Sequence, residues 1–141
     1  MTRALGLDLG SKRIGVAISD SAGTVATPID TIHRQAKRAD YQRIALLVEE
    51  WEAELVVVGL PYSLDGGTGP AALGVLAEIT ALGDTLTVPV VPYDERLTTV
   101  TAERSLMEQG ISGPARRQLV DQVAAAVILQ AWLDAGCPGG A

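Results

Sequence analysis

Three acidic positions in this sequence stand where a carboxylate is hard to explain unless it does chemistry. Asp8 lies in the short apolar run Gly6-Leu-Asp-Leu-Gly10, and strand alternation places it on a face whose other members are alanine and glycine. Glycines weaken a strand and usually mark close approach by another backbone or a ligand. Asp8 is therefore expected to project toward a ligand, the other interpretation being an edge or surface Asp that faces water.

The second acidic position lies in Tyr93-Asp-Glu-Arg-Leu97, where a predicted strand ends just before a helix. Ligand sites in open α/β sheets form at such strand ends. Asp94 and Glu95 point to opposite sides if the strand persists, so only one of them can easily join Asp8. The residues alone leave the choice open, because Asp94 could cap the following helix while Glu95 pairs with Arg96 on the surface.

The third acidic position, Asp121, lies in a predicted helix and shares its face with three residues that would pack inward. These are Ala124, Ala125 and Ile128, at i+3, i+4 and i+7. A buried, unpaired carboxylate is costly, and the alanines would let this helix lie close to the sheet and bring Asp121 toward the first strand. The alternative is a structural salt bridge, for example to Arg117 four residues earlier.

Carboxylates gathered at one place repel each other, and such sites are normally completed by hard cations such as Mg²⁺ or Mn²⁺. Three acids on separate elements suit a phosphodiesterase with two metal ions, in which one ion activates water and the other stabilises the leaving oxygen. The single histidine, His33, and the single cysteine, Cys137, are given no role.

The elements that position these acids follow from hydrophobic periodicity. Alternating or unbroken apolar runs predict strands over residues 3–10, 13–20, 24–32, 55–60 and 88–93. Helical spacing predicts helices over residues 39–53, 71–82, 98 or 99 to 109, and 114–135. The first two strands form a β-hairpin, and the strand over 55–60 is apolar on both faces, as in a central parallel strand. The fold class is therefore α/β, a mixed five-stranded sheet with helices on both faces.

Composition indicates one globular domain over residues 1–141, with residues 136–141 as a flexible tail. The chain is 48% hydrophobic and 20% charged, which excludes a disordered protein. Its longest apolar run, Val123–Leu133, is too short to span a membrane. With one cysteine, no internal disulfide can form and nothing indicates an oxidising compartment, so the cytoplasm is the expected location.

The net charge of −6 argues against a surface that binds polyanions everywhere, so the local placement of basic residues matters. Lys12 and Arg13 lie just after Asp8, and another basic pair precedes Asp121. Four of the eleven basic residues fall in the stretch 34–43, for which a solvated helix face is the ordinary interpretation.

Four segments together resemble the YqgF (RuvX) family of the ribonuclease H-like superfamily, which is related to the RuvC-type resolvases. They are GLDLGSKRIGVAISD, VVVGLPYSLDGGTGP, YDERLTT and VDQVAAAVILQAWLD, in order from Ala4 to Asp134. The resemblance implies a ribonuclease H-like fold and an acidic, metal-binding triad of Asp8, Glu95 and Asp121, which selects Glu95 over Asp94. It also implies a nuclease linked to maturation of the 5′ end of pre-16S rRNA, with Holliday-junction resolution as the other proposed role.

The nucleic acid bound by such a protein would be RNA, or branched or single-stranded DNA. The residues expected to contact it are Lys12, Arg13, Arg96, Arg116 and Arg117. The segment before the third acid is usually crowded with Lys and Arg in this family, whereas residues 113–118 keep only two. Resolution of a junction would need two active sites and therefore a homodimer.

Two functions of other classes compete with a nuclease. Asp-Leu-Gly followed by a hairpin also begins the phosphate-binding strand pair of actin-like and sugar-kinase ATPases. Those proteins close two such domains over a nucleotide, and these 141 residues provide one. The other competitor is a non-catalytic RNA-binding module that keeps the fold without the chemistry.

Overall fold

The centre of the molecule is a five-stranded sheet with strand order β3-β2-β1-β4-β5. The computed structural model describes residues 3–62, 67–110 and 114–139. The strands are β1 (Ala4–Leu9), β2 (Arg13–Ser19), β3 (Ala26–His33), β4 (Leu55–Leu60) and β5 (Val90–Asp94). β1, β2 and β3 are antiparallel neighbours, while β4 runs parallel to β1 and β5 parallel to β4. The predicted mixed sheet and its N-terminal hairpin are confirmed.

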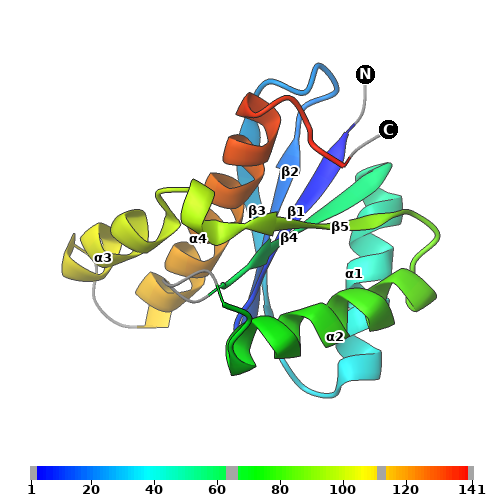
Figure 1. The fold of residues 1–141 in the computed structure, drawn as a ribbon, viewed down its shortest axis with the longest axis horizontal. Coiled ribbons are helices and arrows are strands. Elements are labelled where there is room, and N and C mark those ends of the chain that lie inside the picture. Colours follow the sequence, from blue (N-terminus) through cyan, green and yellow to red (C-terminus); the bar gives the residue numbers. More distant parts are fainter. Residues whose placement is uncertain (1–2, 63–66, 111–113, 140–141) are drawn as a thin grey trace.

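Helices cover both faces of this sheet, as predicted (Figure 1). They are α1 (Lys37–Glu50), α2 (Pro70–Thr85), α3 (Val100–Gly110) and α4 (Pro114–Asp134), with a 3₁₀ turn, η1 (Glu95–Leu97), after β5. α1 and α2 lie on one face and α4 on the other, where α3 packs mainly against α4. One face of the sheet is therefore covered by a pair of helices and the other chiefly by a single long helix.

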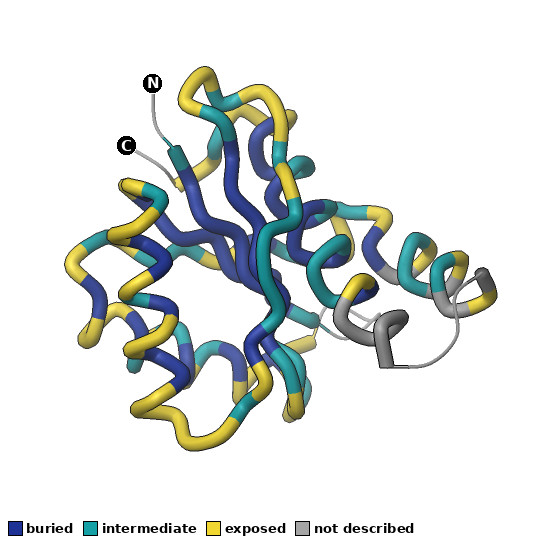
Figure 2. Tube along the Cα trace, turned by 180° about the vertical axis from the view of Figure 1, so that it is seen from behind, coloured by how far each residue is buried: buried dark blue, intermediate teal, exposed yellow. Residues whose placement is uncertain are grey.

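Strand alternation divides the interior into two hydrophobic cores. Leu5 and Leu7 of β1 face α1 and α2, whereas Ala4 lies in the core beneath α4 with the buried Trp132. Every residue of β4 is buried, as expected for a central strand between two parallel neighbours. In Figure 2 the middle strands are dark blue and the helices carry exposed residues on their outer sides. Asp8 follows the alternation of β1, so it belongs to the face beneath α4.

The strand boundaries differ from the predicted ones by at most two residues, as β3 and β5 illustrate. β3 begins two residues later than expected, because the Asp20 carboxylate accepts hydrogen bonds from the backbone N–H groups of Thr24 (2.7 Å) and Val25 (3.1 Å) and holds a turn there. At the other end of the sheet, β5 extends one residue further than expected, to Asp94, before η1 begins.

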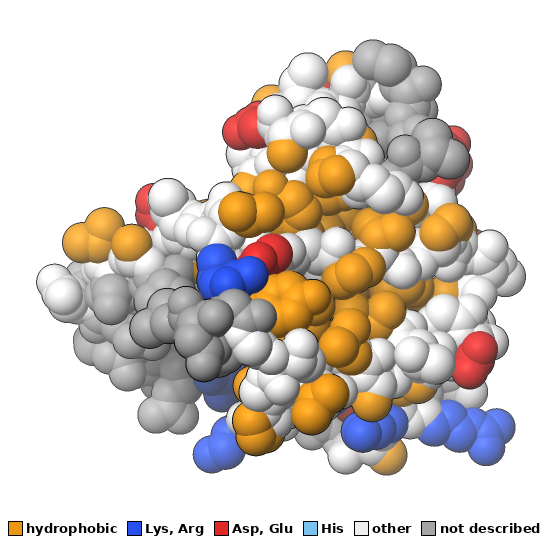
Figure 3. Space-filling model, viewed as in Figure 1, with side chains coloured by type: hydrophobic (Ala, Val, Ile, Leu, Met, Phe, Trp, Pro, Cys, Tyr) orange, Lys and Arg blue, Asp and Glu red, His pale blue; other side chains and the backbone are white. Residues whose placement is uncertain are grey.

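The edge strand β5 carries apolar surface. Hydrophobic side chains gather over the middle of the face across which β5 runs (Figure 3). Pro92 within β5 has no N–H to offer a further strand. This edge is less suited to a polyanion than a surface with basic side chains.

No helix in the part of the chain that the structure describes is both long and apolar enough to cross a membrane. At the C-terminal end, the indole N–H of Trp132 donates a hydrogen bond of 2.8 Å to the carbonyl of Pro138. The flexibility predicted from residue 136 onward stays a prediction.

Candidate active site

The three candidate acids come from three separate elements and line one pocket. Asp8 lies in β1, Glu95 begins η1, and Asp121 lies in α4. The pocket has a volume of about 420 Å³ and is open to solvent. Its other lining residues are Leu9, Gly10, Ser11, Lys12, Arg13, Pro61, Arg104 and Val120. Residues more than a hundred positions apart in the chain thus meet at the end of the sheet where β1 and β5 finish.

Two glycines, which have no side chain, allow the acids to come together. Gly15 of β2 pairs with Asp8, and a Cβ at position 15 would overlap the backbone carbonyl of Asp121. Gly59 of β4 leaves room for the Glu95 side chain in the same way, because a Cβ at position 59 would lie 2.9 Å from a carboxylate oxygen of Glu95. The absence of side chains at these two positions lets α4 and the Glu95 side chain approach the sheet, and Gly6 of β1 contributes as well, because a Cβ there would lie 2.8 Å from the Cβ of Leu129.

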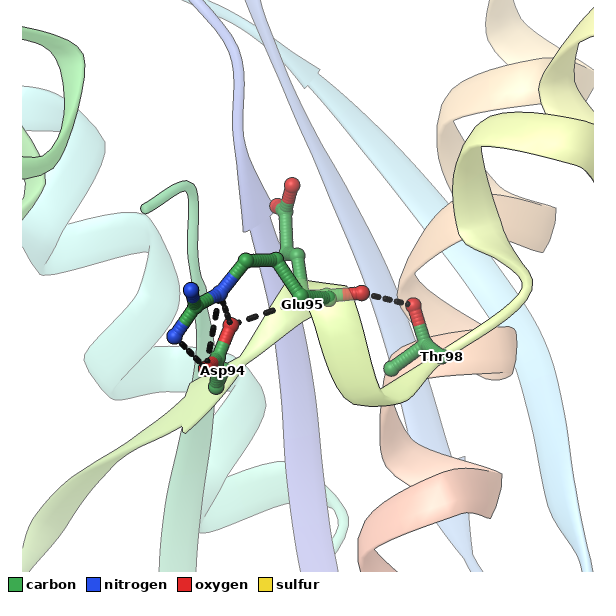
Figure 4. A network of polar contacts seen from close by, with 4 residues as sticks. Asp94, Glu95 and Thr98 are labelled. Carbon is green, nitrogen blue, oxygen red and sulfur yellow. Dashed lines mark hydrogen bonds and ion pairs between the residues drawn. The ribbon is translucent and has the colours of Figure 1, made fainter. Parts of the chain in front are cut away.

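The end of β5 settles which neighbouring acid faces the pocket. The Asp94 carboxylate accepts a hydrogen bond from the backbone N–H of Arg96 (2.9 Å) and pairs with its guanidinium at 2.6 Å. The hydroxyl of Thr98 donates to the carbonyl of Glu95 at 2.6 Å and fixes the turn. In Figure 4 the Glu95 carboxylate points away from the carboxylate of Asp94. Asp94 is therefore the helix cap, and Glu95 is the acid that joins Asp8.

Two arginines enter the pocket and pair with two of the acids. The Nη2 atom of Arg104 donates to Oδ2 of Asp8 at 2.5 Å, and Nε of Arg13 donates to Oδ2 of Asp121 at 2.5 Å. Asp121 therefore has an ion-pair partner in Arg13, from β2, while the pairing considered with Arg117 involves a side chain outside the described part of the structure. The Glu95 carboxylate lies among the same charges, within electrostatic reach of Asp8 and Arg104.

The pKa values of two acids are raised in this environment. Burial raises the pKa of Asp8; the Arg104 charge opposes this, and the Asp121 charge adds to it. Burial also raises the pKa of Glu95, to about 6, with a further contribution from the Asp8 charge and an opposing one from Arg104. The Arg104 charge therefore does not fully offset desolvation and repulsion at Asp8 and Glu95.

Comparison with known proteins identifies the family of this chain. The family model described as RuvX, Holliday junction resolvase, matches residues 2–135. The chain belongs to the RuvX family. A relative from Thermoanaerobacter pseudethanolicus is 42% identical over 133 residues, covering 94% of this chain and 96% of the relative. Another, from Mycobacterium sp. (strain KMS), is 50% identical over 135 residues, covering 94% of this chain and 79% of the relative. Both are named "Putative pre-16S rRNA nuclease".

Solved structures establish the fold of this RuvX family member. RuvC from T. thermophilus, in complex with Holliday junction substrate, matches with a TM-score of 0.59 and 16% sequence identity, over 97% of this chain and 98% of that one. The ribonuclease H-like fold expected from the sequence motifs is confirmed.

The donor set fits a hard divalent cation in its chemistry, because three carboxylates converge on one polar pocket and two of them have raised pKa values. Within the described residues, however, no three carboxylate, imidazole or thiol groups form a cluster that could hold a metal ion. The ion pairs with Arg13 and Arg104 accompany this arrangement. A cation would therefore require these pairs to rearrange.

The residues expected to contact nucleic acid have different positions in this RuvX family member. Lys12 and Arg13 line the pocket, whereas the guanidinium of Arg96 pairs with Asp94 and lies 5.1 Å from the ring centroid of Tyr62. Arg116 and Arg117 belong to the first turn of α4, and their side chains lie outside the described part of the structure.

Arg104 is the pocket residue that sequence reasoning missed. It follows the second acid by nine positions within a helix, and the nearer Arg96 carries the same charge. In the structure Arg96, in the 3₁₀ turn, pairs with Asp94, whereas Arg104, in α3, pairs with Asp8. The one signal in the sequence was the presence of a basic residue in the helix that follows an acidic strand end.

Proposed function

We propose that this chain is a metal-dependent nuclease that hydrolyses phosphodiester bonds of RNA in the cytoplasm, with the 5′ end of pre-16S rRNA as its substrate. The observation that carries the proposal is that Asp8, Glu95 and Asp121, from three separate elements, line one pocket. The names of the relatives support the choice of rRNA.

The three carboxylates would hold Mg²⁺ or Mn²⁺. Two such ions, when bound, supply an activated water and a stabilised leaving oxygen. The backbones of Asp8 and Asp121 both lie against Gly15, which brings the two acids close together. Glu95 closes the pocket from the third side.

Basic residues at the rim would hold the phosphate backbone beside these acids. Lys12 and Arg13 lie at the hairpin turn next to Asp8, and Arg116 and Arg117 lie in the first turn of α4. Because the net charge is −6, affinity for a polyanion must come from such local groups.

Resolution of DNA four-way junctions is the second candidate function. The description of the matching family as a Holliday junction resolvase favours it. Symmetric cleavage of a junction needs two active sites, so this function would require a homodimer.

The test offers purified protein three labelled substrates side by side, with Mg²⁺ or Mn²⁺: single-stranded RNA, single-stranded DNA and a four-way junction. The controls are EDTA, Asp8→Asn, and Asp94→Asn as a matched change of an acid outside the pocket lining. Metal-dependent RNA cleavage that Asp8→Asn abolishes and Asp94→Asn retains supports the proposal.

Other outcomes of the same panel would replace it. Cleavage confined to the four-way junction would make the protein a resolvase. Tight RNA binding without cleavage at any metal concentration would make it a non-catalytic RNA-binding module.

A further inference from the structure

Among the described residues that line the pocket, Arg104 is the charged one for which the proposed chemistry has no use. Its Nη2 atom lies 2.5 Å from Oδ2 of Asp8, and its side chain lines the pocket while remaining 34% exposed. The Asp8 side chain is only 10% exposed. The guanidinium thus covers the pocket side of a buried carboxylate.

The charge of Arg104 acts on two acids together. It favours the charged form of Asp8 and also that of Glu95, so it lies within electrostatic reach of both. A hard cation shared by these carboxylates would need the same region of negative potential. Because like charges repel strongly in a partly buried site, a cation and this guanidinium cannot both contact Asp8 at full strength.

The element that carries Arg104 is joined to the core at its first residue, the buried Val100, and Arg104 lies one turn beyond it with a side chain that is 34% exposed. α3 packs mainly against α4, and it projects away from the sheet in Figure 1. Arg13 differs, because it begins β2, where it pairs with His33 of β3 and its carbonyl accepts a hydrogen bond of 3.0 Å from the backbone N–H of Gly10. Of the two arginines in the pocket, Arg104 is therefore the one whose release costs the fold less.

We propose that Arg104 takes the place of a divalent cation in the metal-free protein, is displaced from Asp8 when the cation binds, and then binds a phosphate oxygen of the substrate. This inference rests on the proposed metal-dependent function. A guanidinium suits both partners, since its fork of N–H donors matches carboxylate and phosphate oxygens. Displacement moves the positive charge from an acid of the protein to the polyanion that must be held.

The proposal predicts opposite changes in two affinities. Arg104→Gln removes the competing charge, so Mn²⁺ should bind more tightly, by roughly 5- to 150-fold, the usual range for two coupled sites. The same variant should bind single-stranded RNA more weakly, because glutamine cannot form a charged pair with a phosphate oxygen. Arg104→Lys keeps the charge without the fork, and both of its affinities should lie between those of the wild type and Arg104→Gln.

Calorimetric titration with Mn²⁺ in the absence of nucleic acid measures the first affinity. RNA binding at saturating Ca²⁺, with cleavage monitored on a gel, measures the second. Arg43→Gln is the matched control, because Arg43 forms an ion pair with Asp30 away from the pocket and its side chain is 49% exposed. It should match the wild type in the Mn²⁺ titration, and thermal unfolding in EDTA verifies that each variant is folded.

The outcomes separate this inference from the function on which it rests. Unchanged or weaker Mn²⁺ binding by a folded Arg104→Gln protein would overturn the inference, while the proposed function stands if the wild type still cleaves RNA. A loss of both affinities would give Arg104 a merely structural role and would also overturn it. If the wild type binds no Mn²⁺ and cleaves nothing, both proposals fall.

Discussion

Two regions of this molecule bring carboxylates and arginines together, and they do so with opposite results. On the face covered by α1 and α2, the Glu78 carboxylate accepts hydrogen bonds from both terminal nitrogens of Arg34, at 2.7 and 2.8 Å, and from the Tyr41 hydroxyl at 2.7 Å. Burial alone would raise the pKa of Glu78, but the hydrogen bonds from Arg34 and Tyr41 outweigh it, so that pKa is lowered. In the pocket, the pKa values of Asp8 and Glu95 are raised.

The difference comes from the ratio of donors to acids. One carboxylate with three donors is satisfied, so Glu78 ties α2 both to Tyr41 in α1 and to Arg34 in the segment that precedes α1. In the pocket, ion pairs are made by Asp8 and Asp121, and the pKa values of Asp8 and Glu95 nevertheless stay raised. A satisfied cluster stabilises the fold, whereas an unsatisfied one has capacity left for a ligand.

Substitutions of the acids in the two clusters should differ most in their effect on catalysis. Glu95→Gln or Asp121→Asn should each lower the cleavage rate by about 10³-fold, and the double variant should lose little more, because the acids act as a unit. Glu78→Gln should leave the rate within about twofold once the folded fraction is taken into account. Single-turnover cleavage measures these rates, and full activity of Glu95→Gln would remove that residue from the mechanism.

The next largest effect is on stability, where the substitution at Glu78 should have the larger effect and the substitution at Glu95 the smaller. Glu78→Gln should lower the free energy of unfolding by about 2–3 kcal/mol, because it leaves the Arg34 guanidinium largely buried without its counter-charge. Glu95→Gln should not destabilise the metal-free protein, since it removes a repelled charge. Urea unfolding in EDTA compares the two. Equal losses would mean that the two clusters are not different in kind.

Basic residues that belong to neither cluster allow a third comparison. Replacing Arg116 and Arg117 by alanine should weaken RNA binding and reduce the slope of log affinity against log salt by about 0.7–0.9 for each phosphate that the variant no longer neutralises. Alanine at Arg38 and Arg43 of α1 should leave the slope unchanged. If only the α1 variant flattened the slope, the nucleic acid would cross α1 and not the start of α4.

The smallest effect is the pH dependence of stability, whose sign should differ between the clusters. Glu95 has a folded pKa raised from 4.5 to about 6, so its contribution to stability is full below about pH 4.5 and is lost as pH rises through 6. After solvent screening this amounts to about 1 kcal/mol. The lowered pKa of Glu78 works the other way, since its contribution is lost as pH falls.

Melting curves in EDTA between pH 4.5 and 7 test this sign. The stability of the wild type should fall over that interval relative to Glu95→Gln. Parallel curves for the two proteins would show that the Glu95 carboxylate carries no such shift.

The sequence predicted the sheet and its helices because hydrophobic periodicity records which face of each element is buried. Asp8 on a face of glycine and alanine, and Asp121 beside two alanines, revealed the close contact between helix and sheet before the structure did. The choice between Asp94 and Glu95 could not be made from the residues alone, because it depends on where β5 gives way to a 3₁₀ turn. The ion-pair partners of the acids could not be predicted from the sequence either. Arg13 is 108 residues from Asp121 in the chain, and Arg104 is 96 residues from Asp8.

The absence of a side chain at Gly15 limits which substitutions this protein can accept during evolution. Gly15 lies opposite Asp8 and against the backbone of Asp121, so the distance between the backbones that carry those two acids is set by main-chain contact at Gly15. Substitutions around the rim can alter charge and the choice of polymer while this spacing stays fixed. A single methyl group at position 15 would instead push α4 away from the sheet and change the spacing, although the identity of every surface residue would be unchanged. Substitutions that adapt the protein to new substrates are therefore expected at the border of the pocket and not at Gly15.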